Sequence, residues 1–182
     1  MDTAQVRASD EQNDVNIRPE SPADWAGIRA VEEAAFERKG EADLVDALRR
    51  AGALTVSLVA VQGGQVVGHI AFSPIDIADQ DNATTALCLA PIAVLPACQR
   101  ANIGAALVQA GLEACRAAGA TVVVVLGHPS YYPRFGFQPA MPLGIEPPFA
   151  VPNEAFLVAE LTPGGLAGHK GTVRYRPEFA LV

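Results

Sequence analysis

The stretch from Leu87 to Phe137 constrains the fold more than any other part of the chain. An extended run is followed by the turn Gln99–Gly104, a helical pattern over 102–118 and a second apolar run, Thr121–Gly127. The second run is unbroken and rich in valine, as in central strands that are covered on both faces. An aromatic segment, 131–137, follows it directly. This order predicts an α/β core with a strand-to-helix turn near its centre.

The composition indicates one globular domain. The chain has 182 residues, of which 50% are hydrophobic and 18% charged, enough for one well-buried core. Residues 1–13 lack apolar periodicity and are expected to form a flexible tail, so the domain is expected to span 14–182. No apolar run has membrane-spanning length, and no basic segment precedes an apolar one. These features predict a soluble, cytoplasmic protein without a membrane partner.

Charge and cysteine content exclude several function classes. The formal net charge is −7, and the 13 lysine and arginine residues are scattered, which disfavours nucleic-acid binding. A cationic small substrate is compatible with that charge. The three cysteines, Cys88, Cys98 and Cys115, match neither a disulfide framework nor a zinc site in their spacing. We expect packing roles for them and no metal.

Two helices are predicted in the N-terminal part, after a short strand over 15–18. The segment Ser21–Asp24 offers an N-cap, a proline in the first turn and a carboxylate that can reach back. The helix that it starts should run to Phe36, with Glu32 and Glu33 beside an apolar face. That face is expected to contain Trp25, Ile28, Val31 and Ala35. A second helix is predicted over 41–51.

Extended segments make up most of the rest. Alternation over 54–60, the Gly63-Gly64 pair and a further run over 65–75 predict a β-hairpin. A polar loop over 76–85 is expected next, and then a strand, Leu87–Val94. Pro91 within that strand lacks a ladder donor and indicates an edge, a bulge or broken pairing. The C-terminal part predicts strands over 155–161 and 172–175. The expected fold is therefore α/β (α+β), with a mixed, mostly antiparallel sheet flanked by helices.

The turn after Leu87–Val94 resembles the coenzyme A site of the GNAT superfamily of acetyl-CoA-dependent N-acetyltransferases. In that family a Gln/Arg-x-x-Gly-x-Gly/Ala turn leads into a helix, whose free N–H groups suit the pyrophosphate. The match runs from Gln99 to Ala106. Asn102 stands at the usual first glycine, and asparagine tolerates a left-handed conformation well. The resemblance implies cofactor contacts from Gln99, Arg100, Ala101, Asn102, Ile103, Gly104 and Ala105.

Two other interpretations of this turn stay open at the sequence level. Short glycine patterns are common, so the segment could be an ordinary strand-to-helix connection whose small residues ease packing. A dinucleotide-binding turn fits less well, because its second glycine is missing and the motif lies in mid-chain.

A second motif supports the GNAT resemblance. Tyr131–Phe137 is similar to the family's Phe-Tyr-x-x-x-Gly-Phe segment, and with Pro129 it resembles a bacterial branch carrying Pro-x-Tyr-Tyr-x-Arg-Phe-Gly-Phe. The resemblance implies that Tyr132 lies near the thioester sulfur and protonates the departing thiolate. The alternative is a buried tyrosine that only packs. Tyr131 is expected to pack beside it, and Arg134 to be a surface charge or to pair with a carboxylate.

The resemblance assigns a further task to the strand before the turn. In the family the sheet splays between its fourth and fifth strands, and the backbone of the fourth holds the pantetheine arm of coenzyme A. Ile92, Ala93 and Val94 occupy the matching positions, which core strand residues would fill equally well. Some relatives use a glutamate on this strand as general base, but Leu87–Val94 contains no acid. The remaining candidates for the base are Glu33, Glu41, Asp76, His69 and His128.

The resemblance implies an N-acetyltransferase that moves the acetyl group of acetyl-CoA to a primary amine by direct attack in a ternary complex. The amine can be a small molecule or part of a protein. Its pocket is expected from the helices near 22–51 and from later loops. The alternatives are a catalytically inert coenzyme-A-binding module and a purely structural interaction domain. Extended C-terminal strands that pair across subunits make a homodimer plausible.

Overall fold

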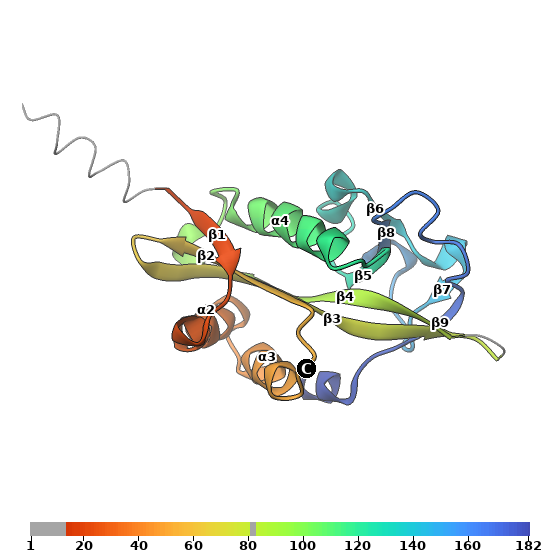
Figure 1. The fold of residues 1–182 in the computed structure, drawn as a ribbon, viewed down its shortest axis with the longest axis horizontal. Helices are drawn as coiled ribbons and strands as arrows, with labels where there is room; N and C mark the ends of the chain where they lie inside the picture. Colours follow the sequence, from red (N-terminus) through yellow and green to blue (C-terminus); the bar gives the residue numbers. More distant parts are fainter. Residues whose placement is uncertain (1–13, 81–82) are drawn as a thin grey trace, which may run out of the picture.

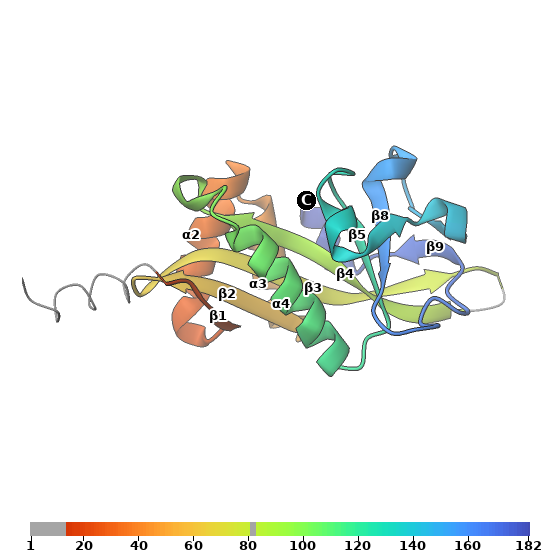
Figure 2. The same ribbon diagram turned by 90° about the horizontal axis from the view of Figure 1, so that it is seen from above.

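A sheet with helices on both faces forms the framework (Figures 1 and 2). The structure is a computed structural model that describes residues 14–80 and 83–182, so the tail predicted over 1–13 lies outside it. Within the described residues, neighbouring strands follow the order β1 (Asn16–Pro19), β2 (Val56–Gln62), β3 (Gln65–Ala78), β4 (Ala83–Val94), β5 (Val122–Leu126), β8 (Phe156–Glu160) and β6 (Phe137–Pro139). Off this path, β9 (Gly171–Arg174) pairs with β3 and with β7 (Ile145–Glu146). The pairs β4–β5 and β7–β9 are parallel and the others antiparallel, which confirms the predicted mixed sheet.

Within residues 14–80 and 83–182, three α-helices cover the sheet. Figure 1 shows α2 (Trp25–Phe36) and α3 (Gly40–Arg50) on one face and α4 (Ile103–Ala117) on the other. The remaining helical pieces are 3₁₀ turns: η1 (Pro22–Asp24), η2 (Pro96–Cys98), η3 (Tyr132–Phe135), η4 (Met141–Leu143), η5 (Asn153–Ala155) and η6 (Pro177–Leu181). The helices predicted up to Phe36 and over 41–51 and 102–118 are confirmed within one or two residues. In the part of the chain that is described, no helix is long and apolar enough to cross a membrane.

The start of the first helical segment follows the predicted capping chemistry. The Ser21 N–H donates to Asp24 Oδ2 at 2.7 Å, so the carboxylate does reach back. The predicted apolar face is only partly right. Trp25 is 44% exposed, and the guanidinium of Arg49 lies 5.0 Å from its ring centroid. Glu32, expected beside the core, is fully buried. It stands one turn after Ile28 and finds a polar partner on β3.

The hairpin of β2 and β3 turns at Gly63 and Gly64, whose φ angles of 55° and 81° need glycine. The polar loop predicted over 76–85 is wrong, because β3 continues to Ala78 and β4 begins at Ala83. Pairing of β3 with β9 buries Ile77 completely and extends the strand.

Pro91 interrupts the pairing of β3 with β4, as predicted. Ile70 pairs with Ile92, but Phe72 pairs with Leu89, so two residues of β4 oppose one of β3. On the opposite side of the strand, β4 pairs with β5 at Leu87–Val123 and Cys88–Val124. After Cys88, β4 pairs with no other described strand on the β5 side.

The helix α4 packs closely on the centre of the sheet. A side chain at Gly111 would place its Cβ 2.5 Å from the ring of Phe72 on β3, so glycine permits this approach. Leu107 and Val108 are buried there. On the outer face of the helix, Gln109, Glu113 and Arg116 are exposed. The strand β5 is buried over Val122–Val125, as its apolar run predicts.

Candidate functional site

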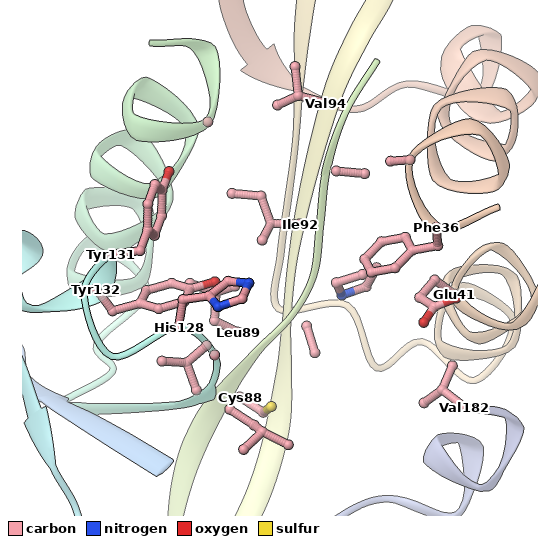
Figure 3. Close-up of a pocket in the computed structure, with 18 of the residues that line it drawn as sticks. Phe36, Glu41, Cys88, Leu89, Ile92, Val94, His128, Tyr131, Tyr132 and Val182 are labelled. Atoms are coloured by element: carbon pink, nitrogen blue, oxygen red, sulfur yellow. The ribbon is translucent and has the colours of Figure 1, made fainter. Parts of the chain in front are cut away.

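A cavity of about 1000 Å³ opens where β4 and β5 diverge. Its lining includes β4 from Cys88 to Val94 and the end of β5 with the residues that follow, Val125–His128. Figure 3 shows Tyr131, Tyr132 and His128 on the side of α4, and Phe36 and Glu41 on the side of α2 and α3, with β4 between them. The cavity therefore passes along the unpaired edge of β4 and has one part on the side of α4 and one on the side of α2 and α3.

The residues that the GNAT resemblance assigns to the cofactor gather at this cavity, with one exception. Ala101 is exposed in the turn and does not line it. The other nine line the cavity: Ile92, Ala93, Val94, Gln99, Arg100, Asn102, Ile103, Gly104 and Ala105. The carboxamide Nε2 of Gln99 donates to the carbonyl oxygen of Val94 at 3.1 Å, which ties the turn to the end of β4.

The turn before α4 has the backbone of an anion site. Asn102 is left-handed, with φ 61° and ψ 6°, and Arg100 has φ 63°, which the sequence does not indicate. The first intrahelical bond runs from the Ala106 N–H to the Asn102 carbonyl, and the N–H groups before it are the unpaired donors of a helix start. A Cβ at Gly104 would lie 3.1 Å from Tyr131 Oη. Glycine therefore lets the Tyr131 hydroxyl pack against the first turn of α4.

Tyr132 projects into the cavity from η3. Its side chain points toward β4 near Leu89 (Figure 3), and the residue is only 6% exposed. The ring makes edge contacts with Tyr131 and Phe137, at centroid distances of 5.1 and 5.5 Å. Burial, followed by the nearby Tyr131 and Cys88, raises the pKa of Tyr132 to about 12. The phenol therefore keeps its proton in the neutral range.

Arg134 is an exposed charge, one of its two expected roles, and it also contacts two rings. Its guanidinium lies 4.1 Å from the ring centroid of Tyr131 and 4.9 Å from that of Phe135. The exposed cation thus stacks on the aromatic segment. Tyr131 packs beside Tyr132 as predicted and also lines the cavity.

Only two of the five candidates for a general base reach the cavity, Glu41 and His128. Glu41 is buried, and both of its carboxylate oxygens accept from Arg38 Nε, at 3.1 and 3.0 Å. His128 is exposed at the end of β5. The two therefore face the cavity from opposite sides of β4 (Figure 3).

The other three candidates have partners elsewhere. Glu33 pairs with Arg29 at 3.0 Å, and Asp76 is exposed near the far end of β3. His69 is fully buried, with its Nδ1 2.6 Å from Glu32 Oε1 and its Nε2 2.9 Å from Ser57 Oγ. This Glu32–His69 pair joins α2 to the sheet.

The cysteines are unpaired and packed, in keeping with their predicted role. Cys88 and Cys115 are buried, and burial raises the pKa of each thiol to about 12. Cys98 is partly buried and lines the cavity, as Cys88 does. Because a thiol with so high a pKa is not ionised at neutral pH, Cys88 is a poor nucleophile.

Several aromatic residues of the cavity were not identified from the sequence: Phe36, Phe149, Tyr175 and Phe179. Three of them come from the C-terminal part of the chain, two from irregular segments and Phe179 from η6, and they reach the cavity only through tertiary packing. Phe36 ends the first predicted helix and lies within the range 22–51 from which the pocket is expected.

The comparisons with known proteins agree with this geometry. The model of the acetyltransferase (GNAT) domain family matches residues 16–140. The uncharacterized N-acetyltransferase YhbS of Escherichia coli K12 is 38% identical over 164 residues, which cover 90% of this chain and 97% of that protein. The uncharacterized N-acetyltransferase YjhQ of the same strain is 37% identical over 155 residues, covering 81% and 86%.

Two solved structures share both sequence and fold with the chain. Escherichia coli YhbS in complex with CoA has a TM-score of 0.85 at 37% identity, covering 91% of this chain and 92% of that one. A GNAT family acetyltransferase from Brucella melitensis in complex with acetyl-CoA has a TM-score of 0.75 at 40% identity, covering 92% and 99%. The predicted family and fold are thereby confirmed: the chain belongs to the GNAT family of acetyltransferases.

Proposed function

We propose that this protein transfers the acetyl group of acetyl-CoA to a primary amine by direct attack in a ternary complex. The observation that carries the proposal is the cavity between the diverging strands β4 and β5. It extends from the start of α4 to Tyr132 and continues on the side of α2 and α3. The relatives with bound CoA and acetyl-CoA support this use of the cavity.

Acetyl-CoA supplies a thioester whose carbonyl carbon forms a C–N bond with the amine nitrogen, while the C–S bond breaks and coenzyme A leaves as a thiol. The N–H groups at the start of α4 and the left-handed turn at Asn102 would hold the pyrophosphate. The free edge of β4 at Ile92–Val94 would pair with the pantetheine arm as an added strand would.

Tyr132 is the proposed catalytic residue. Its phenol is protonated at neutral pH and can donate a hydrogen bond to the sulfur as negative charge develops there. When the C–S bond breaks, the proton passes to the sulfur, and the phenolate regains a proton from water. The coenzyme A thiol has an ordinary pKa of roughly 8.5, well below that of Tyr132. Full proton transfer from the phenol is therefore unfavourable, and the hydrogen bond to the sulfur contributes more to the rate than the transfer does.

An amine in water is mostly protonated at neutral pH, because its ammonium form has a pKa of roughly 10. It must therefore lose a proton before it attacks. Glu41 and His128 are the two candidate bases that line the cavity. Glu41 faces the acceptor from α3, and Arg38 holds its carboxylate in place. Either residue can pass the proton to solvent through a water molecule.

Calorimetric titration of acetyl-CoA into the wild type and into Gly104→Trp tests this proposal. The indole would occupy the space that the pyrophosphate needs, so we expect saturable binding to the wild type and none to the variant. Ala117→Trp, at the exposed end of the same helix, is the matched control and should bind as the wild type does.

Failure of the wild type to bind millimolar acetyl-CoA would contradict both the transferase and an inert coenzyme-A-binding module. Binding without acetylation of any amine would favour the inert module. Equal binding by Gly104→Trp and the wild type would place the cofactor elsewhere on the protein.

A further inference from the structure

An aromatic wall lines one side of the cavity. Phe149 stacks on Tyr175, with centroids 6.0 Å apart and planes 15° apart, and Tyr175 lies 5.1 Å from Phe179. We call these three residues the aromatic wall. Phe179 also packs against Leu44 and Leu48 of α3. The wall therefore stands on the same side of the cavity as α3, which carries Glu41.

The rim on this side is unusually apolar for an exposed surface. Phe149 is 48% exposed and Phe36, at the end of α2, is 37% exposed, yet both line the cavity. Large apolar side chains gathered at the mouth of a cavity, with a few polar groups, are typical of a site that binds an apolar ligand. Rings at the rim can cover such a ligand and remove its surface from water.

The charges of the cavity limit the acceptor further. Among the described residues that line it, Glu41 supplies the sole side-chain carboxylate, and Arg38 pairs with it. Two further arginines line the cavity, the exposed Arg134 and the exposed Arg100, which belongs to the turn proposed for the pyrophosphate. The acidic surplus of the chain is therefore not concentrated here. An acceptor with several ammonium groups would bury charges that lack partners, at a large cost in free energy.

We propose that the acceptor is a small primary monoamine on an apolar body, either aromatic or branched aliphatic. The body lies against the aromatic wall and Phe36, and the amine lies between Glu41 and the thioester. This inference rests on the proposed transferase function and specifies its substrate class. It sets the protein apart from transferases that acetylate polyamines or other polycations.

The test compares two pairs of amines with the full-length protein and saturating acetyl-CoA. The apolar monoamines are 2-phenylethylamine and isopentylamine, and the polycations are putrescine and spermidine. Release of the coenzyme A thiol gives the rate, and mass spectrometry of the acetylated amine confirms each product. We expect kcat/KM for both monoamines to exceed that for both polycations by about tenfold or more. A polycation would lose at least one contact with an aromatic side chain, and such a contact corresponds to about a tenfold change.

Phe149→Ala separates a specific contact from general reactivity. We expect it to raise KM for 2-phenylethylamine by about tenfold and to leave calorimetric binding of acetyl-CoA unchanged. Leu143→Ala is the matched control, because Leu143 is 37% exposed but does not line the cavity. Its KM should equal that of the wild type.

The outcomes separate this inference from the proposed function. If putrescine or spermidine is acetylated as well as the monoamines, the inference is wrong and the transferase function stands. If acetyl-CoA binds but neither monoamine is acetylated, the inference is also wrong. If acetyl-CoA does not bind at all, the proposed function fails first. An unchanged KM in Phe149→Ala would show that the aromatic wall does not contact the acceptor.

Discussion

The ring of Tyr132 lies so close to Gly127 that a Cβ at residue 127 would come within 2.2 Å of Tyr132 Cε2. Gly127 follows β5 directly, and Tyr132 begins η3, so the contact spans the loop after the central strand. Phe137 makes an edge contact with the same ring at a centroid distance of 5.5 Å. Because the ring is buried and leaves no room for a Cβ at residue 127, the position of the phenolic oxygen depends on glycine there.

Gly127→Ala should displace Tyr132 and lower kcat by about a hundredfold, because a shift of about 1 Å in a reacting group has an effect of this size. Binding of acetyl-CoA should weaken far less, since the three atoms nearest to a Cβ at residue 127 all belong to Tyr132 and none to the turn before α4. Steady-state kinetics would measure the first effect and calorimetry the second. When Gly127→Ala is added to Tyr132→Phe, kcat should fall little further, because the phenolic oxygen is already absent. Wild-type kcat in Gly127→Ala would contradict the assigned position.

Tyr132→Phe should lower kcat by about a hundredfold or more while the affinity for acetyl-CoA stays the same. The active form is the protonated phenol, and burial holds its pKa near 12. The wild-type rate should therefore not fall as pH rises through about 8 to 10, where a phenol of ordinary pKa begins to lose its proton. A pH–rate profile checks this. Tyr131→Phe is the control, and equal kcat in Tyr132→Phe and the wild type would leave Tyr132 a packing residue.

The order of elements could be predicted from the sequence wherever a local pattern sets the structure. Glycine pairs, a capping carboxylate and a valine run each act over a few residues, so the hairpin, the first helix and β5 follow from them. Pro91 was informative for the same reason, since a missing N–H donor disturbs pairing wherever it lies. The short strands β6 and β7 were missed because two or three residues hold no periodicity.

The same distinction between local patterns and long-range packing applies to the residues of the candidate site. The turn Gln99–Ala105 and Tyr132 belong to contiguous motifs and could be named in advance. The acceptor side could not, because Phe149 and Tyr175 reach it through packing between segments that are distant in the sequence. Glu32 was misplaced for a related reason: its burial depends on His69, 37 residues away along the chain. Hydropathy alone assigns a glutamate to the surface, although its spacing from Ile28 puts it on the core face.

Asn102 should be replaceable by glycine and not by a β-branched residue. Its φ of 61° is open to asparagine and glycine, whereas valine in that region is strained by about 1–3 kcal/mol. We expect Asn102→Gly to keep the affinity for acetyl-CoA and Asn102→Val to weaken it several-fold. Calorimetry with both variants, after their folding is checked by thermal unfolding, would measure the difference. Equal affinity in Asn102→Val would show that the left-handed turn does not matter for binding.

Asp24 should contribute stability that disappears in acid. Hydrogen bonds from Arg18, and then from Ser21, hold the pKa of this carboxyl well below its ordinary value of 3.8. A carboxyl whose folded pKa is depressed stabilises the protein above the unfolded pKa and loses that contribution as pH falls below it. Asp24→Asn should therefore cost roughly 1 kcal/mol at about pH 7, and less near pH 3. Urea unfolding at both pH values measures this. A cost that is independent of pH would contradict it.

The Glu32–His69 pair should behave as one unit in a double-mutant cycle. Both side chains are fully buried, and 2.6 Å separates Glu32 Oε1 from His69 Nδ1. Glu32→Leu or His69→Leu would leave the other group buried without its partner, at a cost of about 3 kcal/mol each. The double variant replaces both groups by apolar ones and should cost clearly less than the sum. Urea unfolding of the four proteins gives the coupling free energy. Additive losses would mean that α2 is held to the sheet by its apolar contacts, and that the pair adds nothing of its own.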